Sequence, residues 1–287
     1  MGRRIGIIGG TGLYELRGLE DVRALRVETP YGDPSDTLLL GRLGDAELVF
    51  LPRHGRGHRI NPSEVNYRAN IWALKSLGVE WVIAVSAVGS LREEIAPGHV
   101  VTVDQFIDRT KGRDATFFED GVVAHVSFGD PICPVVRGVL AQAAKEAGAV
   151  VHPEGTYVCM EGPAFSTRAE SNLYRSWGAS VIGMTNLTEA KLAREAELSF
   201  ATLALVTDYD CWFDGHDAVT SASVMEVLSA NVSLAREVLA LAIPVLAAYT
   251  DPPPMSSALE HALLTPAGRI SPEVRERLGI ILGKYLR

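Results

Sequence analysis

Three arginines and two histidines lie within the seven-residue stretch Arg-His-Gly-Arg-Gly-His-Arg (53–59), directly after a short apolar run. Arginine presents a planar fork of donors that matches the oxygens of a phosphate group. The alternative is a solvent-exposed charged loop without a ligand, but the glycines between the cations favour a loop folded into an anion-binding site. His54 and His58 have a spacing that could hold a metal ion only on a helix, which the two glycines disfavour. We therefore predict a phosphate site and no metal ion.

Two other segments offer small donors to an anion. Gly-Gly-Thr-Gly (9–12) ends an apolar run, and glycine turns of this kind expose backbone N–H groups. Its spacing is neither G-x-G-x-x-G nor a P-loop, so a plain tight turn stays an alternative. Ser86 belongs to Val-Ser-Ala-Val-Gly-Ser (85–90), at the end of another predicted strand, where ligands of α/β sheets gather, although it could be a simple strand-to-loop hydroxyl.

Carboxylates and one aromatic ring could contact a flat base. Asp208 and Asp210 follow a very apolar run, and carboxylates at a buried strand end are costly unless they are used. A carboxyl group can protonate a purine N7, or accept from an exocyclic amine when ionised. Phe165 lies among small residues, where it could stack on the base. The alternatives are turn or N-cap aspartates and a loop aromatic that fills the local core.

The elements that must position these residues alternate between strands and helices. Apolar runs predict strands at residues 4–8, 47–51, 81–88 and 201–207. Asn61, Pro62 and Glu64 have the pattern of N-cap, N1 and N3 of a helix, which continues with Tyr67 and later apolar residues at helical spacing up to Gly78. This alternation predicts an α/β fold with a largely parallel central sheet.

The end of the chain is set apart by Asp-Pro-Pro-Pro (251–254), the strongest linker signal. We predict one catalytic domain at residues 1–250 and a C-terminal helical appendage at residues 251–287. The appendage should contain an amphipathic helix that begins at Ser271-Pro272 and places Val274, Leu278, Ile281, Leu282 and Tyr285 on one face. It should pack on the main body or on a neighbouring subunit.

Composition narrows the class of protein. The 287-residue chain has a formal net charge of −8, which disfavours general binding to nucleic acid. Three cysteines without a C-x-x-C pair make a disulfide framework unexpected and favour a reducing cytoplasm. The longest apolar stretch, residues 238–249, is too short to span a bilayer and contains Pro244, so we expect no membrane association.

Taken together, these segments resemble the purine nucleoside phosphorylase family, and within it the branch that cleaves 5′-methylthioadenosine. The resemblance runs from about Ile5 to Pro244. The motifs that carry it, in order, are GIIGGTG (6–12), RHGR (53–56), NYRANIWAL (66–74), GSLREEI (89–95), DQFIDRT (104–110), EGP (161–163) and TDYDCW (207–212).

The resemblance implies a single α/β domain with a mixed sheet and helices around it, subunits that form homotrimers, and inorganic phosphate as a co-substrate with no cofactor. It implies a phosphate site made of Thr11, Arg53, His54, Ser86, Ala87 and Thr185. It implies a nucleoside site made of Met184, Phe165, Ser166, Asp208, Asp210, Val224, Met225 and, from the neighbouring subunit, His125. Asp208 and Asp210 are the expected catalytic residues. The expected reaction releases adenine and 5-methylthioribose 1-phosphate, as in purine and methionine salvage.

Asp208 favours adenine, because family members that prefer 6-oxopurines have asparagine there. Asn186 and Ser221 depart from the pattern and leave methylthioinosine or 6-oxopurine nucleosides as alternative substrates. A nucleotide-binding regulator would need neither Arg53 nor His54, and a hydrolase would act without phosphate.

Overall fold

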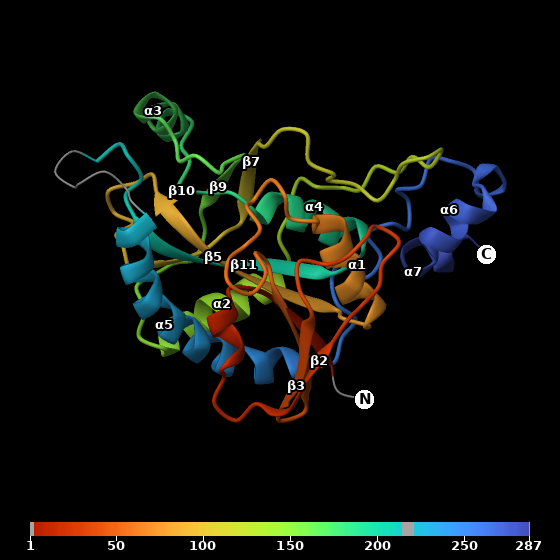
Figure 1. The fold of residues 1–287 in the computed structure, drawn as a ribbon, viewed down its shortest axis with the longest axis horizontal. Helices are drawn as coiled ribbons and strands as arrows, with labels where there is room; N and C mark the ends of the chain where they lie inside the picture. The colour runs from red at the N-terminus through yellow and green to blue at the C-terminus, as the bar shows by residue number, and fades with distance from the viewer. Residues whose placement is uncertain (1–2, 214–220, 287) are drawn as a thin grey trace.

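An eleven-stranded mixed sheet forms the centre of the structure, a computed structural model that describes residues 3–213 and 221–286 (Figure 1). The side chains of residues 11, 221–226 and 228–229 are outside that description. Neighbouring strands follow the order β2 (Glu20–Leu25), β3 (Leu38–Leu43), β4 (Ala46–Pro52), β1 (Arg4–Gly9), β5 (Trp81–Ser90), β10 (Val181–Gly183), β9 (Thr156–Met160) and β7 (Gln105–Arg109). On the other edge of β5, β11 (Ser199–Asp208) continues to β6 (Val100–Thr102) and β8 (Val151–His152).

The four central strands β4, β1, β5 and β11 run parallel, and the antiparallel pairs lie outside them. The four predicted strands all form, each one to three residues longer than predicted at one or both ends. The sheet is therefore the mixed one that the resemblance implied. In β11 nine of the ten residues are buried, because helices cover both faces of a central parallel strand.

The partners of β5 change along its length. One edge pairs with β11 almost throughout, and the other pairs with β1 from Trp81 to Ala84 and with β10 at Gly89 and Ser90. Among the described strands, residues 85–88 pair with β11 alone. This interruption leaves room at the carboxyl ends of the central strands, where ligands of α/β proteins bind.

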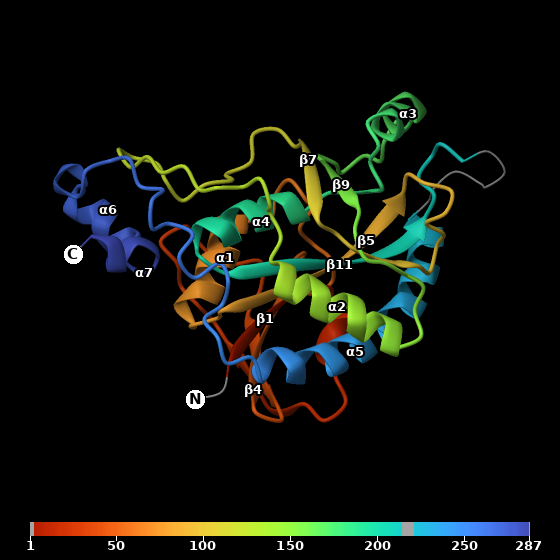
Figure 2. The same cartoon turned by 180° about the vertical axis from the view of Figure 1, so that it is seen from behind.

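Two helices cover each face of the sheet. Helices α2 (Pro134–Glu146) and α5 (Ser221–Ala247) lie on one face, and α1 (Tyr67–Ser76) and α4 (Asn186–Glu195) lie on the other (Figures 1 and 2). Residues 230–247 of α5 are apolar and long enough to cross a membrane, longer than the predicted stretch. In this structure they pack on the core through Ala235, Val238, Leu239, Ala242, Ile243 and Leu246, all fully buried.

The predicted start of α1 is wrong. Asn61 caps a turn instead, since its Oδ1 accepts from the backbone N–H groups of Ser63 (2.9 Å) and Glu64 (3.2 Å). The helix begins at Tyr67, where Asn66 Oδ1 accepts from the N–H of Ala69. A capped turn and a capped helix share one sequence signature, and at Asn61 the chain forms the turn.

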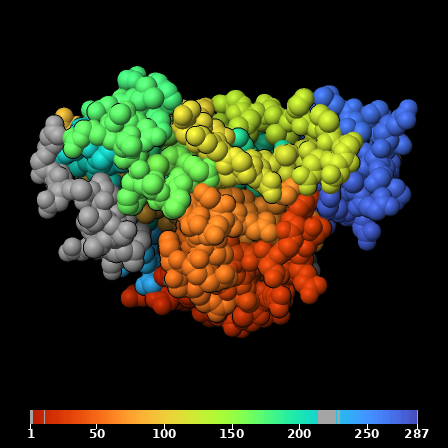
Figure 3. Space-filling model, turned by 45° about the horizontal axis from the view of Figure 1, so that its top comes forward, coloured from red at the N-terminus to blue at the C-terminus, as the bar shows by residue number. Residues whose placement is uncertain are grey.

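The C-terminal segment packs on the main body, but it is not one helix. It divides into α6 (Pro272–Arg277), α7 (Gly279–Leu282) and a 3₁₀ turn at Gly283–Tyr285, because glycines interrupt the helical run. The predicted apolar face nevertheless reaches the core, where Val274, Leu278, Ile281 and Leu282 are buried. Figure 3 shows this segment, in blue, against the yellow-green segment that follows β7, and a bridge from Ala124 to Leu263 joins the two.

Candidate active site

A cavity of about 630 Å³ opens at the carboxyl ends of the central strands. Its walls come from the ends of β1, β4, β5 and β11, from the turn at residues 58–64, from the segment around Phe165 and from the start of α4. Of the predicted site residues it brings together Arg53, His54, Ser86, Ala87, Phe165, Met184, Thr185, Asp208 and Asp210. Residues that are up to 157 positions apart in the sequence therefore share one cavity.

Arg53 lies at one end of the cavity, at the end of β4, and is only 3% exposed. Its Nε and Nη2 donate to the two carboxylate oxygens of Glu189, the latter at 3.0 Å, and its Nη1 donates to the carbonyl of Val85 at 2.9 Å. Burial opposes its charge, but the carboxylate of Glu189 raises the pKa of Arg53 above its usual value. Arg53 is thus a fixed cation whose remaining N–H groups can meet an anion.

His54 lies beside Arg53 and is held by two contacts. Its Nδ1 donates to the carbonyl of Ile60 at 2.8 Å, and its ring stacks on His58 with centroids 4.4 Å apart. Burial, with help from the charge of Arg53, lowers the pKa of His54 to about 4. The imidazole is therefore neutral near pH 7, and its Nε2 can accept a hydrogen bond from the hydroxyl of a hydrogen phosphate ion.

The amino end of α4 completes this end of the cavity. Thr185 is its N-cap residue, is 4% exposed and makes no capping hydrogen bond with its side chain. The N–H groups of a first helical turn, with the helix dipole, favour an anion. Ser86, 7% exposed, comes from the interrupted stretch of β5. Thr11 follows β1 at the start of a 3₁₀ turn, but its side chain lies outside the described part of the chain.

Two aspartates lie at the opposite end of the cavity, four residues farther along β5. Arg53 bonds to Val85, whereas a Cβ added at Gly89 would lie 2.9 Å from Asp208 Oδ1. Asp208 ends β11 and accepts from Thr207 Oγ1 (2.7 Å) and from the backbone N–H of Asp210 (2.8 Å). Burial raises the pKa of Asp208 above its usual value. Burial also raises the pKa of Asp210, and the negative charge of Asp208 adds to that effect. Among the described residues the buried Asp210 Oδ2 has no hydrogen-bond partner, so a donor on a ligand could satisfy it.

Phe165 and Met184 line the cavity near these carboxylates. Phe165 remains 47% exposed, so its ring is available to a ligand. Ser166 is 8% exposed and, although near Asp210, is not part of the cavity wall in this structure. Met184 packs against Gly162, where an added Cβ would lie 2.5 Å from its sulfur atom. That glycine also has a φ of +71°, which suits glycine alone.

Besides Ser166, three predicted nucleoside contacts are not seen in this cavity. His125 is exposed, and its backbone N–H donates to the carbonyl of Ala262 at 2.9 Å. It does not line the cavity of its own chain. Val224 and Met225 belong to the first turns of α5, but their side chains lie outside the described residues.

Sequence reasoning missed two buried residues that support the site. Glu189, 1% exposed, pairs with Arg53 and also accepts from Asn186 Nδ2 at 2.9 Å. Arg113, whose side chain is 2% exposed, bonds to the carbonyl of Met184 at 2.6 Å. The only sequence signal for Glu189 was a carboxylate one helical turn after Thr185 and Asn186, and nothing local marks Arg113.

Known proteins resemble the chain over its whole length. Residues 4–244 match the phosphorylase superfamily. S-methyl-5′-thioadenosine phosphorylase of Geobacter sulfurreducens is 56% identical, covering 98% of this chain and 99% of the relative. The enzyme of the same name from Thermosynechococcus vestitus is 53% identical, covering all of both chains.

Solved structures with a similar fold belong to proteins with similar names. A methylthioadenosine phosphorylase from an antarctic soil metagenomic library superposes with a TM-score of 0.94 at 49% identity, covering 98% of this chain and 99% of that one. Methylthioadenosine phosphorylase from Schistosoma mansoni, in complex with adenine, superposes with a TM-score of 0.83 at 41% identity, covering 86% of this chain and 93% of that one. The chain belongs to the phosphorylase superfamily.

Proposed function

We propose that the chain catalyses the phosphorolysis of 5′-methylthioadenosine to adenine and 5-methylthioribose 1-phosphate. The observation that carries this proposal is a single cavity that brings together the cation Arg53, the start of α4 and the carboxyl groups of Asp208 and Asp210. Two relatives more than 50% identical over nearly the whole chain are named for this substrate.

The chemistry follows from the two ends of the cavity. A phosphate oxygen attacks C1′ of the ribose while the bond from C1′ to N9 breaks, through an oxocarbenium-like state similar to that of glycoside cleavage. The bonding electrons leave with the purine, and a protonated Asp208, favoured by its raised pKa, gives a proton to N7. The proton of the hydrogen phosphate ion balances the one that adenine gains, so no net proton is consumed.

The 6-amino group of adenine supplies the donor that an ionised Asp210 Oδ2 lacks. Phosphorolysis of a 6-oxopurine nucleoside or of methylthioinosine is the second candidate, because Asn186 departs from the family pattern. In this structure, however, Asn186 does not line the cavity, and its Nδ2 donates to Glu189. We further propose a cytoplasmic homotrimer in which His125 reaches the neighbouring subunit's nucleoside site. No metal ion or organic cofactor enters the proposed reaction.

Turnover of methylthioadenosine, methylthioinosine, adenosine and inosine, each with and without phosphate, tests the proposal. Phosphate-dependent release of adenine, fastest from methylthioadenosine, supports it. Phosphate-dependent release of hypoxanthine as the faster reaction would favour the second candidate, and release of base without phosphate would indicate a hydrolase. Arg53→Ala should raise the KM for phosphate most strongly, and unchanged turnover at limiting phosphate would refute the proposed anion site.

A further inference from the structure

Arg113 is buried beside the cavity without lining it. Its side chain is 2% exposed, and the guanidinium makes four hydrogen bonds. Nη1 donates to the carbonyl of Met184 (2.6 Å) and to the hydroxyl of Tyr67 (3.1 Å). Nη2 donates to the carbonyl of Glu161 (2.6 Å), and Nε donates to its carboxylate at 3.1 Å.

Through these acceptors Arg113 is joined to three different segments that line the cavity. Met184 directly precedes the N-cap of α4. Glu161 begins the segment that carries Pro163 and Phe165. The hydroxyl of Tyr67 donates in turn to the carbonyl of Pro62, in the turn at residues 58–64. One side chain thus joins segments that are about 120 residues apart in the sequence.

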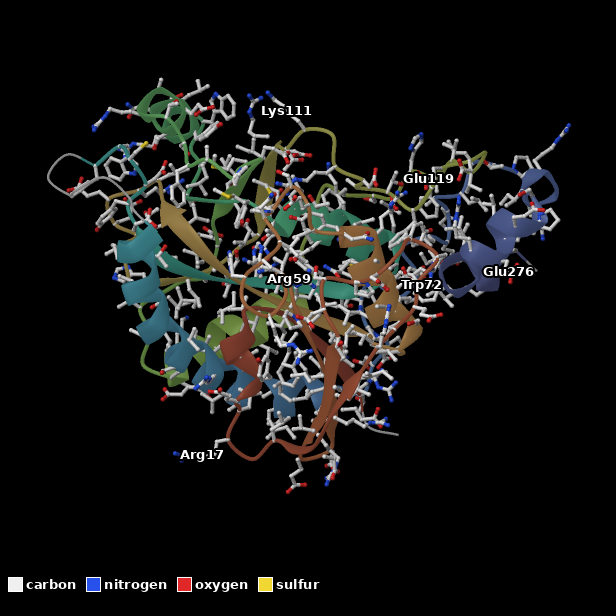
Figure 4. The ribbon with its side chains drawn as sticks, viewed as in Figure 1. Arg17, Arg59, Trp72, Lys111, Glu119 and Glu276 are labelled. Carbon is white, nitrogen blue, oxygen red and sulfur yellow. The ribbon has the colours of Figure 1, made fainter. Side chains whose placement is uncertain are left out.

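Glu161 extends this connection. Its carboxylate accepts from Ser63 Oγ at 2.6 Å and from the backbone N–H of Lys111 at 2.5 Å. Burial alone would raise the pKa of Glu161, but these donors together with Arg113 hold it below its usual value. Figure 4 shows the side chain of Lys111 above β7, pointing away from the rest of the chain, so only its backbone takes part.

The geometry needs an arginine. Its five N–H donors in one plane can meet two carbonyls, a hydroxyl and a carboxylate at once, whereas a lysine ammonium is a compact point charge. We propose that Arg113 is a positioning residue that fixes Met184 and the segment around Phe165, and thereby sets affinity for the nucleoside. Glu189 separately holds Arg53 and Asn186 at the start of α4, so affinity for phosphate should change less. This inference rests on the proposed phosphorolysis.

The test compares Arg113→Lys and Glu161→Gln with the unmodified protein. Arg113→Lys should raise the KM for methylthioadenosine and weaken adenine binding by roughly tenfold to a hundredfold, since a misplacement of about 1 Å can cost a factor of that size. The KM for phosphate should stay within about twofold. Glu161→Gln, at a side chain that is 25% exposed, should produce the same selective change in smaller degree.

Arg3→Lys is the matched control. Arg3 also donates to a carboxylate, that of Glu80, and to backbone carbonyls, but it lies at the opposite end of β1 from the cavity. It should leave both KM values unchanged. Equal changes in the two KM values, or unchanged adenine binding by calorimetry in both Arg113→Lys and Glu161→Gln, would overturn the inference. If Arg113→Lys fails to fold, Glu161→Gln alone decides. Unmodified protein that neither turns over the nucleoside nor binds adenine would instead refute the proposed function.

Discussion

Glu189→Gln removes a charge that is buried against Arg53 while it keeps the size of the side chain. The two side chains are 4% and 1% exposed, so water screens neither of them. In the described structure the Arg53 guanidinium has the Glu189 carboxylate and the carbonyl of Val85 as its partners. Glutamine can accept only one of the two hydrogen bonds and supplies no charge.

The expected loss of stability in Glu189→Gln follows from the buried charge of Arg53, which no carboxylate then compensates. Breaking a buried ion pair by removing one partner typically destabilises a protein by about 3–5 kcal/mol. We expect a loss of that size in the free energy of unfolding without phosphate. Because a phosphate dianion can then neutralise Arg53, the variant should bind phosphate more tightly, and each tenfold gain in affinity returns about 1.4 kcal/mol at saturation.

Denaturant unfolding at one protein concentration, with and without phosphate, measures both effects. Glu47→Gln is the matched control, since Glu47 pairs with Arg4 at half-exposed positions of 41% and 37%. It should cost below about 1 kcal/mol, whatever the phosphate concentration. A loss below about 1 kcal/mol in Glu189→Gln, or phosphate that stabilises it no more than the unmodified protein, would refute the reasoning about the Arg53–Glu189 pair.

Three further predictions concern the base site, pH and the C-terminal segment. Asp208→Asn should shift the ratio of the two kcat/KM values, for methylthioadenosine and methylthioinosine, toward methylthioinosine by about tenfold to a hundredfold, because an amide can donate a hydrogen bond to O6. An unchanged ratio would contradict the proposed role of Asp208 in binding adenine. Burial raises the pKa of Glu195 from 4.5 to about 7, so the folded protein binds this proton more tightly than the unfolded chain does. The stability that this proton contributes is fully present below about pH 4.5 and is lost as the pH rises through about 7. Glu195→Gln should therefore lose less unfolding free energy between about pH 5 and pH 8 than the unmodified protein, and parallel pH profiles would argue against this. Tyr285→Phe removes a hydrogen bond to the carboxylate of Glu197, whose side chain is 2% exposed. The free energy of unfolding in urea should fall by about 1–2 kcal/mol, with unchanged KM values. An unchanged free energy of unfolding would mean that this contact does not hold the C-terminal segment.

The sequence predicted what depends on local pattern. Uninterrupted apolar runs predicted the central strands, because a strand buried on both faces has no polar face to display. The same runs placed Asp208 at a strand end and Ser86 near one, and parallel strands bring such ends to one edge, although Ser86 lies inside β5, four residues before its end. The cations at residues 53–59 then predicted a phosphate site at that edge, and this stays a prediction.

Contacts made at long range could not be predicted in this way. Arg113 has no motif of its own, since its acceptors are the carbonyls of residues 48 and 71 positions away. The prediction that a helix begins at Asn61 was wrong because a polar cap followed by proline and glutamate stabilises a turn as well as a helix. The glycines that divide the last helical run were visible in the sequence, but their effect depends on the surface that the segment follows.

Arg53, Glu189 and His54 together bring almost no net charge to the proposed phosphate site. Glu189 balances Arg53, and His54 is neutral near pH 7 because burial lowers its pKa to about 4. If this site binds phosphate as proposed, hydrogen-bond geometry, the dipole of α4 and the more distant cation Arg59 must supply the selectivity, rather than a surplus of charge at Arg53 and His54. A dianion held in this way keeps more of its own negative charge than one neutralised by two cations. Such a charge suits an ion that must attack C1′ and also stabilise the positive ribose beside it.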